Sequence, residues 1–370
     1  EIVGRWRPDG PGEEEEEAAC YGKPVRKFVR TSERNGRAVA SLALADGDEG
    51  ILAAGRRDGT VRFYDAGGTR GLRQILPGHR GAVVAVAFCG ENFLSASSDR
   101  TLRRYHLDSA GGTVRAIYLD TLYGHQSDVT DVAVSHVTNR RGEVADARPI
   151  SVASDRTARV WKTDEGTHLI LRAGGGTVGF AECVCAVSTS TALESGSSNV
   201  NFVTCGGEDN GTVALWSAGK KRPLDSLPAA HGTEGGRANG ILSCAAVRGS
   251  LNPDVFATGS TDGRVRLWQV RSNSDADADN QMQQKKRAGS SHVACIGSVP
   301  AEGFVNGLAI GPRGRFIIAA LGREHRLGRY GGMPKGSKNR VVLINLQEQG
   351  STTTHKEKKY NDAEGKGKKE

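Results

Sequence analysis

The segment SDRTARVW at residues 154–161 is one of five related stretches that decide the fold. The other four are RDGTVRFY (57–64), SDRTLRRY (98–105), DNGTVALW (209–216) and TDGRVRLW (261–268). In each, an Asp or Asn stands six residues before the aromatic residue that closes an alternating run. The acid or amide favours a tight turn, glycine supplies a positive φ where it is present, and the alternation is typical of a strand. Each stretch therefore predicts a turn followed by a strand.

Two more short apolar runs precede each stretch. Residues 83–88 and 93–96 precede the second stretch, and residues 129–134 and 150–153 precede the third. Short apolar runs between turns predict strands, so the repeating unit is expected to hold about four of them. Two weaker units, one ending at Trp6 and one covering 340–346, bring the count of units to seven.

Two Gly-His pairs strengthen the repeat. Gly78-His79 and Gly124-His125 each stand just before the first strand of a unit. A four-stranded unit that carries this pair and recurs after about 40 residues or more resembles the WD40 repeat. The resemblance implies an all-β fold, a seven-bladed WD40 β-propeller. We expect its first blade to be incomplete at the N-terminus of this chain, with the inner strands upstream of Glu1.

The resemblance also assigns structural roles to the repeat positions. In WD40 proteins the His bonds to the turn Asp and the strand Trp, which implies one buried network of His125, Asp155 and Trp161. Structural roles of this kind are also expected for His79, Asp99, Trp216, Asp262 and Trp268.

Composition agrees with a β-rich chain that meets an anionic partner. The 370 residues include 50 glycines and only 5% aromatic residues, which favours many short strands over a helical core. Lys and Arg exceed Asp and Glu by 50 to 42, and the net charge of +8 suits an anionic partner. Since no apolar run approaches the roughly 18 residues of a membrane span and no signal peptide is visible, we expect no membrane and an intracellular location.

Motifs for catalysis and for metal binding are missing from the sequence. The seven cysteines contain no C-x-x-C pair and no zinc-site spacing, so reduced thiols and no metal are expected. Cys183 and Cys185 alternate within an apolar run and are expected to be small buried side chains. Phosphate-binding loops, zinc-protease motifs and nucleophile elbows are also absent. The sequence predicts a protein that is not an enzyme and holds no cofactor.

The propeller is expected to cover residues 1–346. Charged or Ser-rich runs predict surface loops inserted at about 138–148, 188–201, 272–290 and 322–339. Residues 347–370 have no apolar periodicity and many lysines, and they predict a basic disordered tail.

The stretch from Arg313 to Arg340 concentrates the positive charge. It holds eight Lys or Arg residues against one acid, Glu324, and residues 322–339 replace what is a short turn in the neighbouring units. A plain solvated loop is one interpretation. The other is an RNA contact, in which Tyr330 stacks on a base and the polar side chains neutralise phosphates. The side chains assigned to phosphates are Arg323, His325, Arg326, Arg329, Lys335 and Lys338. A second basic cluster, Lys220, Lys221 and Arg222, could extend the same footprint.

Two stretches make the resemblance more specific. EHRLGRY (324–330), preceded by AALG (319–322), and GTVALWSAGKKRPL (211–224), followed by AHG (230–232), are similar to the WD40 protein family of the U3 small nucleolar ribonucleoprotein. Tyr330 stands where that family has Trp, which keeps an aromatic ring. The long charged insertions depart further from the family.

The resemblance implies a nucleolar scaffold without catalytic activity. Its partners would be U3 small nucleolar RNA near the box B/C element, a small kink-turn-binding protein and other proteins of the small-subunit processome. The implied process is pre-rRNA processing in ribosome biogenesis. The implied contacts are Arg323, His325, Arg326 and Arg329 in the last-blade loop and Lys220, Lys221 and Arg222 after the fifth aromatic strand. Arg326 could instead hold the loop by pairing with Glu324.

Two other classes of function stay open at this point. A WD40 adaptor that binds only proteins would use the basic loop to meet an acidic peptide. An enzyme would need perturbed acids or histidines converging in the central channel of the propeller, and the repeat positions use most of the candidates.

Overall fold

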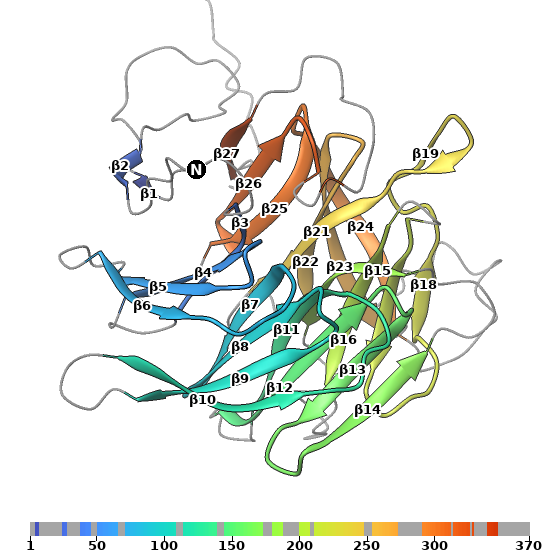
Figure 1. Cartoon of the computed structure of the whole chain (residues 1–370). Helices are drawn as coiled ribbons and strands as arrows, with labels where there is room; N and C mark the ends of the chain where they lie inside the picture. Colours follow the sequence, from blue (N-terminus) through green and yellow to red (C-terminus); the bar gives the residue numbers. More distant parts are fainter. Residues whose placement is uncertain are drawn as a thin grey trace, which may run out of the picture.

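The computed structural model describes residues 4–6, 24–27, 38–45, 50–65, 71–108, 114–138, 144–172, 180–187, 200–207, 211–247, 254–272, 291–311, 314–325, 328 and 339–346. Within this part of the chain, six antiparallel sheets succeed one another around a common axis (Figure 1). In each sheet the strands follow in chain order from the inside of the ring outwards, as the propeller prediction requires. We call the six sheets blades A to F.

The bounds of the strands are as follows. Blade A contains β3 (Val39–Leu44), β4 (Ile51–Arg56), β5 (Val61–Asp65) and β6 (Leu72–Leu76). Blade B contains β7 (Val83–Cys89), β8 (Asn92–Ser97), β9 (Leu102–Asp108) and β10 (Arg115–Leu122). Blade C contains β11 (Val129–Thr138), β12 (Val144–Ala153), β13 (Thr157–Lys162) and β14 (Thr167–Arg172). Blade D contains β15 (Ala181–Val187), β16 (Asn201–Gly206), β17 (Val213–Ser217) and β18 (Asp225–Leu227). Blade E contains β21 (Ile241–Ala246), β22 (Val255–Ser260), β23 (Arg264–Ser272) and β24 (Ser291–Pro300). Blade F contains β25 (Phe304–Ile310), β26 (Phe316–Gly322) and β27 (Arg340–Asn345). Two hairpins stand outside the blades, β1 (Gly4–Trp6) with β2 (Pro24–Lys27) and β19 (Thr233–Glu234) with β20 (Arg237–Ala238).

The repeated stretches that decide the fold all become the third strand of a blade. Tyr64, Tyr105, Trp161, Trp216 and Trp268 lie on β5, β9, β13, β17 and β23, and every one of them is buried. The turn before the strand needs a left-handed residue. Gly59 (φ 80°) supplies it in blade A, whereas blade B uses Arg100 (φ 72°). The prediction of a turn followed by a strand is confirmed in blades A, B, C and E, and Asn210 of the blade D stretch lies outside the described residues.

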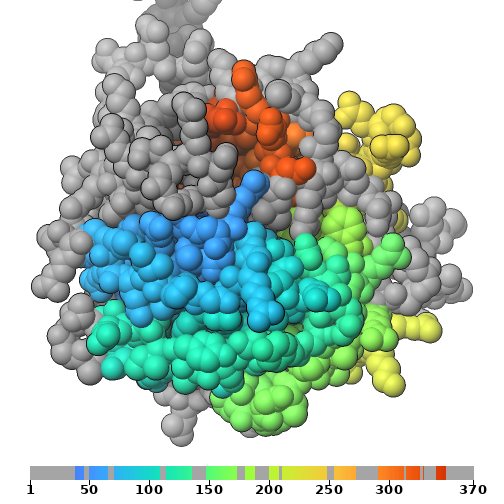
Figure 2. Space-filling model, in the orientation of Figure 1, coloured from blue at the N-terminus to red at the C-terminus, as the bar shows by residue number. Residues whose placement is uncertain are grey.

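The core of the molecule is a set of interfaces between neighbouring blades. Each hydrophobic cluster of appreciable size joins two of them, for example Phe63 of blade A with Phe93 of blade B, and Val152 of blade C with Phe202 of blade D. The inner strands follow in the order β3, β7, β11, β15, β21 and β25, each in contact with the next. Figure 2 shows blades A to C, blue to green, as one continuous packed surface. Apolar burial between blades is therefore what holds the ring.

The predicted count of seven blades is not confirmed. The described residues form five four-stranded blades and one three-stranded blade. Residues 340–346 do supply the third strand of the last blade, as expected, because β27 pairs with β26. Trp6 lies on β1, whose described partner is β2.

One predicted loop is shorter than expected. Strand β11 extends to Thr138 and β12 starts at Val144, with Thr138 paired to Val144. Much of the expected loop 138–148 therefore belongs to a long hairpin. The sequence did not reveal it because these residues are mostly polar and lack the apolar alternation of a strand. Of the other expected loops, most of 188–201, nearly all of 272–290 and most of 322–339 lie outside the described residues, as does the tail 347–370.

Every inner strand carries a β-bulge at its second or third residue. The pairing register shifts at Ala40, Val84, Thr130, Glu182, Leu242 and Asn306, one in each blade. A bulge redirects a side chain relative to the regular alternation of a strand. The polar members of this set, Thr130, Glu182 and Asn306, are consequently aimed differently from their neighbours.

Candidate functional site

A hydrogen-bonded network closes blade C, where the sequence predicted one. His125 Nδ1 lies 3.0 Å from Asp155 Oδ2, and His125 Nε2 lies 2.8 Å from Ser151 Oγ. Trp161 Nε1 donates to the same Ser151 hydroxyl at 2.8 Å. The predicted network of His125, Asp155 and Trp161 is confirmed, with Ser151 as the link that sequence reasoning missed.

The histidine part of the network recurs in blade B, and the whole network recurs in blade E. His79 lies 2.9 Å from Asp99 and 2.8 Å from Ser95. In blade E, His231 lies 3.0 Å from Asp262 and 2.7 Å from Thr258, and Trp268 Nε1 donates to Thr258 at 2.7 Å. In blade D, Trp216 donates to Thr204 at 2.9 Å. The residues predicted to have structural roles take part in these hydrogen bonds, and His231, in the A-H-G stretch, joins them.

These networks set the protonation of their members. Burial alone raises the pKa of Asp99 and of Asp155, but hydrogen bonds from neighbouring side chains and backbone amides outweigh it and hold both pKa values below the usual range. Burial lowers the pKa of His125, and the hydrogen bond to Asp155 only partly offsets that effect. The turn acids therefore stay charged, while the His125 ring is neutral at neutral pH.

Three arginines act as clips beside the networks. Arg159 Nη2 donates to the Gly124 carbonyl at 2.7 Å, and Arg103 and Arg266 donate to the carbonyls of Gly78 and Ala230. Each arginine is the second or third residue of a third strand, and each acceptor directly precedes the network histidine. These guanidinium groups hold the entry loop of their blade by hydrogen bonds to its backbone, so they stabilise the fold.

The meander topology sorts the loops onto two faces of the ring. Because neighbouring strands are antiparallel, the turns between second and third strands share one face with the connections between blades, which we call the upper face. The turns between first and second strands and between third and fourth strands form the lower face. The network acids and histidines all lie on the upper face.

The last-blade loop leaves and re-enters the upper face between β26 and β27, and its base is firmly held. The backbone amide of Arg323 donates to Asn339 Oδ1 at 2.9 Å, which ties the two ends of the loop together. Asn306 Nδ2 donates to the Glu324 carbonyl at 2.7 Å, and the Gly328 amide donates to the His325 carbonyl at 2.9 Å.

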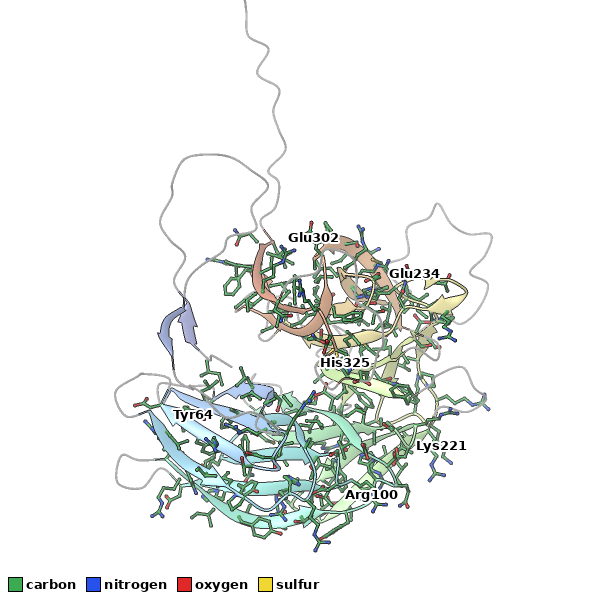
Figure 3. All side chains as sticks on the ribbon, turned by 45° about the horizontal axis from the view of Figure 1, so that its top comes forward. Tyr64, Arg100, Lys221, Glu234, Glu302 and His325 are labelled. Atoms are coloured by element: carbon green, nitrogen blue, oxygen red, sulfur yellow. The ribbon has the colours of Figure 1, made fainter. Side chains whose placement is uncertain are left out.

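His325 anchors this base inside the ring. Its Nε2 lies 3.5 Å from Oε1 of Glu182, and both side chains have 0% exposure. Glu182 belongs to β15 of blade D, so the contact joins two blades that are not neighbours. Figure 3 shows His325 toward the middle of the molecule. Glu182 and Asn306 are both bulge residues, so side chains from two bulges contact the base of the loop. The sequence offered no signal for Glu182, because its role depends on a bulge and on a contact across the ring.

The predicted contact residues fall into three groups, which are exposed, buried or outside the described residues. Arg323, Lys220, Lys221 and Arg222 are exposed. The prediction of an RNA contact at His325 is corrected, because its side chain is buried against Glu182. The side chains of Arg326, Arg329, Tyr330, Lys335 and Lys338 lie outside the described residues.

The two basic clusters do not share a footprint. Lys220, Lys221 and Arg222 lie between β17 and β18, a connection of third to fourth strand, and therefore on the lower face. Arg323 follows β26 and lies on the upper face. The expectation that the second cluster extends the footprint of the first is therefore wrong. The two clusters lie on opposite faces because successive strands of a blade run in opposite directions.

The cysteines form an apolar cluster. Cys183 and Cys185 are buried on one face of β15, as predicted. The Sγ atoms of Cys183, Cys205 and Cys244 lie within 4.8 Å of one another, from two blades. The hydrogen bond with Cys183 raises the pKa of Cys205, and burial raises the pKa of Cys244. Neutral thiols packed in the interface of blades D and E fit this arrangement.

No helix among the described residues has the length and apolar character that crossing a membrane requires.

Comparisons with known proteins agree with the fold. The family "WD domain, G-beta repeat" matches residues 70–106, 117–162 and 231–269. The U3 snoRNP-associated protein-like EMB2271 of Arabidopsis thaliana is 32% identical over 321 residues, which cover 83% of this chain and 56% of that protein. The U3 small nucleolar RNA-interacting protein 2 of Homo sapiens is 37% identical over 145 residues, 38% of this chain and 26% of that protein.

A solved structure gives the same result over more of the chain. The structure of U3-55K is 27% identical with a TM-score of 0.66, and the match covers 88% of this chain and 86% of that chain. The chain spans about half the length of the curated relatives that it matches over most of its own length. The chain is therefore a WD40-repeat protein, related over most of its length to proteins named for the U3 snoRNP.

Proposed function

We propose that this protein is a non-catalytic scaffold that binds U3 small nucleolar RNA at the box B/C region, together with a small kink-turn-binding protein. The particle would include other small-subunit processome proteins and act in pre-rRNA processing, in the nucleolus. The names of the relatives support an assignment to the U3 ribonucleoprotein. The RNA contact itself is the step that needs an argument from this chain.

The base of the last-blade loop carries that argument. A contact surface for RNA needs cationic side chains in a fixed place, and Arg323 is exposed directly beside an anchor that is fully buried. The loop ends are tied by Arg323 and Asn339, and Asn306 holds the backbone at Glu324. Arg323, Arg326, Arg329, Lys335 and Lys338 are the proposed phosphate contacts, and Tyr330 is the proposed stacking residue.

His325 takes a different part in this proposal. It positions the loop through Glu182 and does not touch RNA. The lower-face cluster of Lys220, Lys221 and Arg222 is proposed as a separate surface for a partner within the particle, since it faces away from the loop.

The test is to cross-link the protein to RNA in its own cells, to recover it and to sequence the attached RNA. We expect reads concentrated on U3 small nucleolar RNA, and we expect their number to fall in the variant Arg323→Gln with Arg326→Gln and Arg329→Gln. Recovery of proteins with no RNA would contradict the proposal and favour a protein-only adaptor.

A further inference from the structure

We propose a second phosphate-binding surface, formed on the upper face at the junction of blades A and B by Arg57, Arg80 and Arg100. The inference rests on the proposed RNA-binding function and extends it from the last-blade loop to a different part of the ring. Its ligand is the sugar-phosphate backbone of the same RNA.

The three arginines belong to segments that touch. Arg57 precedes the turn at Gly59, where an added Cβ would meet the His79 carbonyl at 2.5 Å. Arg80 follows His79, and its amide donates to Asp99 Oδ2 at 2.9 Å. Arg100 follows Asp99. The turn of blade A, the entry loop of blade B and the turn of blade B therefore form one packed ridge, and each segment contributes one exposed arginine.

The carboxylates of this ridge are engaged by neighbouring groups of the turns. Both oxygens of Asp99 are used, Oδ2 by His79 and the Arg80 amide, and Oδ1 by the amide and hydroxyl of Thr101. Asp58 accepts from Thr60 and lies 3.4 Å from the buried Arg56. The carboxylates are therefore engaged within the turns, whereas Arg57, Arg80 and Arg100 are exposed on the same ridge.

The turn residue of blade B is an additional indication. Arg100 has a φ of 72°, a left-handed conformation that is unfavourable for a residue with a side chain and favours glycine. Blade A places Gly59 at the same position of its turn. Blade C repeats the arginine at Arg156, with φ 62° and an exposed side chain, so the basic row continues into the next blade. Strained backbone that presents a charge to solvent is typical of a contact position.

Arginine also fits this ligand better than a general cation would. A guanidinium group presents a planar fork of donors that pairs with phosphate oxygens, whereas Lys is a point charge. The described lysines whose side chains can be placed, Lys162, Lys220 and Lys221, all lie on the lower face. The upper face of blades A to C, in contrast, presents arginines. We therefore favour an RNA backbone as the ligand over an acidic peptide.

The test compares two triple variants that each remove three positive charges. The first is Arg57→Gln, Arg80→Gln and Arg100→Asn, in which Asn tolerates the left-handed turn position. The matched control is Arg115→Gln, Lys162→Gln and Arg271→Gln, three exposed cations at the lower-face ends of β10, β13 and β23. Binding of a U3 small nucleolar RNA transcript is measured at several salt concentrations, and the melting temperature of each variant confirms folding.

We expect the upper-face variant to lower the slope of log affinity against log salt by roughly 2 to 3 units, because each phosphate contact contributes about 0.7 to 0.9. The lower-face control keeps the wild-type slope. An unchanged slope in the folded upper-face variant, or an equal fall in the control, would overturn the inference. Loss of a co-purified protein without a change in RNA slope would also overturn it and assign the ridge to a protein partner. Failure of the wild-type protein to bind the transcript would instead count against the proposed function itself.

Discussion

The upper and lower faces of the ring use polar residues in different ways. On the upper face, Asp155 bonds to His125, to the amide of Gln126 and to Thr157, so one carboxylate joins the entry loop of the blade to its turn. On the lower face, Lys162 pairs with Glu165 three residues away, and both side chains are about half exposed. Polar residues of the upper face therefore stabilise the fold in addition to any role in binding, whereas polar residues of the lower face can be replaced with little effect on stability.

The largest expected effect is a loss of stability when an aspartate of the upper face is replaced by alanine, compared with the same replacement on the lower face. Asp155→Ala leaves the donors of Thr157, Gln126 and His125 without their acceptor in a site with little exposure, so we expect a loss of about 3–5 kcal/mol in the free energy of unfolding. Chemical denaturation measures it. The control Asp164→Ala, at a side chain with 93% exposure on the lower face, should change stability by less than about 0.5 kcal/mol. Similar losses in both variants would contradict the distinction between faces.

The second effect concerns the anchor of the last-blade loop. Glu182→Gln keeps the size of a buried side chain but removes its charge beside His325, so we expect a loss of about 1–3 kcal/mol. Hydrogen exchange should accelerate at the amides of Arg323 and Gly328, which form the loop base. Glu234→Gln, an exposed acid on β19, is the control. Unchanged exchange at both amides would show that the pair does not hold the loop.

The third effect is a dependence of stability on pH that His125 imposes on the upper face. Because burial lowers the pKa of His125 below its usual 6.5, the folded protein binds fewer protons than the unfolded chain below that value. The stabilising contribution is full above pH 6.5 and is lost as the pH falls. The melting temperature should therefore decrease from pH 7 to pH 5, and the decrease should be smaller in His125→Asn. An equal decrease in that variant would assign the pH dependence to other groups.

The smallest effect is expected on the lower face. Replacing Lys220, Lys221 and Arg222 by Gln should change the free energy of unfolding by less than about 0.5 kcal/mol, because all three are exposed and none has a described ion pair. Thermal melting checks this value. A loss above about 1 kcal/mol would mean that this turn contributes to the packing of blade D.

Much of the fold could be predicted because each repeat carries local signals. The aromatic residues at the ends of third strands and the turn acids such as Asp99 were assigned correctly from spacing alone. Ser151 and Thr258, which link histidine to tryptophan, were missed, because a hydroxyl in an apolar strand gives no signal until its partners are placed. The number of blades was not decided by the repeats, since the weak unit at Trp6 is represented here only by the pairing of β1 with β2.

The candidate site was predicted less completely. The charge of the last-blade loop was visible in sequence, but the division of labour inside EHRLGRY was not. A histidine can serve as a phosphate contact, so the residue type of His325 does not reveal its role. Only its placement against Glu182 shows that it is an anchor. Arg103 and Arg100 are three residues apart, yet one clips the Gly78 carbonyl and the other is exposed at the turn.

The sequence by itself determined the repeat, the turns, the strand order and the concentration of positive charge in the last blade, because these follow from local patterns of residue type. The tertiary structure alone decided which charges share a face and which are buried. Strand direction sends the Lys220 cluster and Arg323 to opposite faces, and bulges at Glu182 and Asn306 reach a loop of the last blade. Contacts between residues that are 143 positions apart, such as Glu182 and His325, depend on how the blades are arranged around the axis. No local pattern records that arrangement.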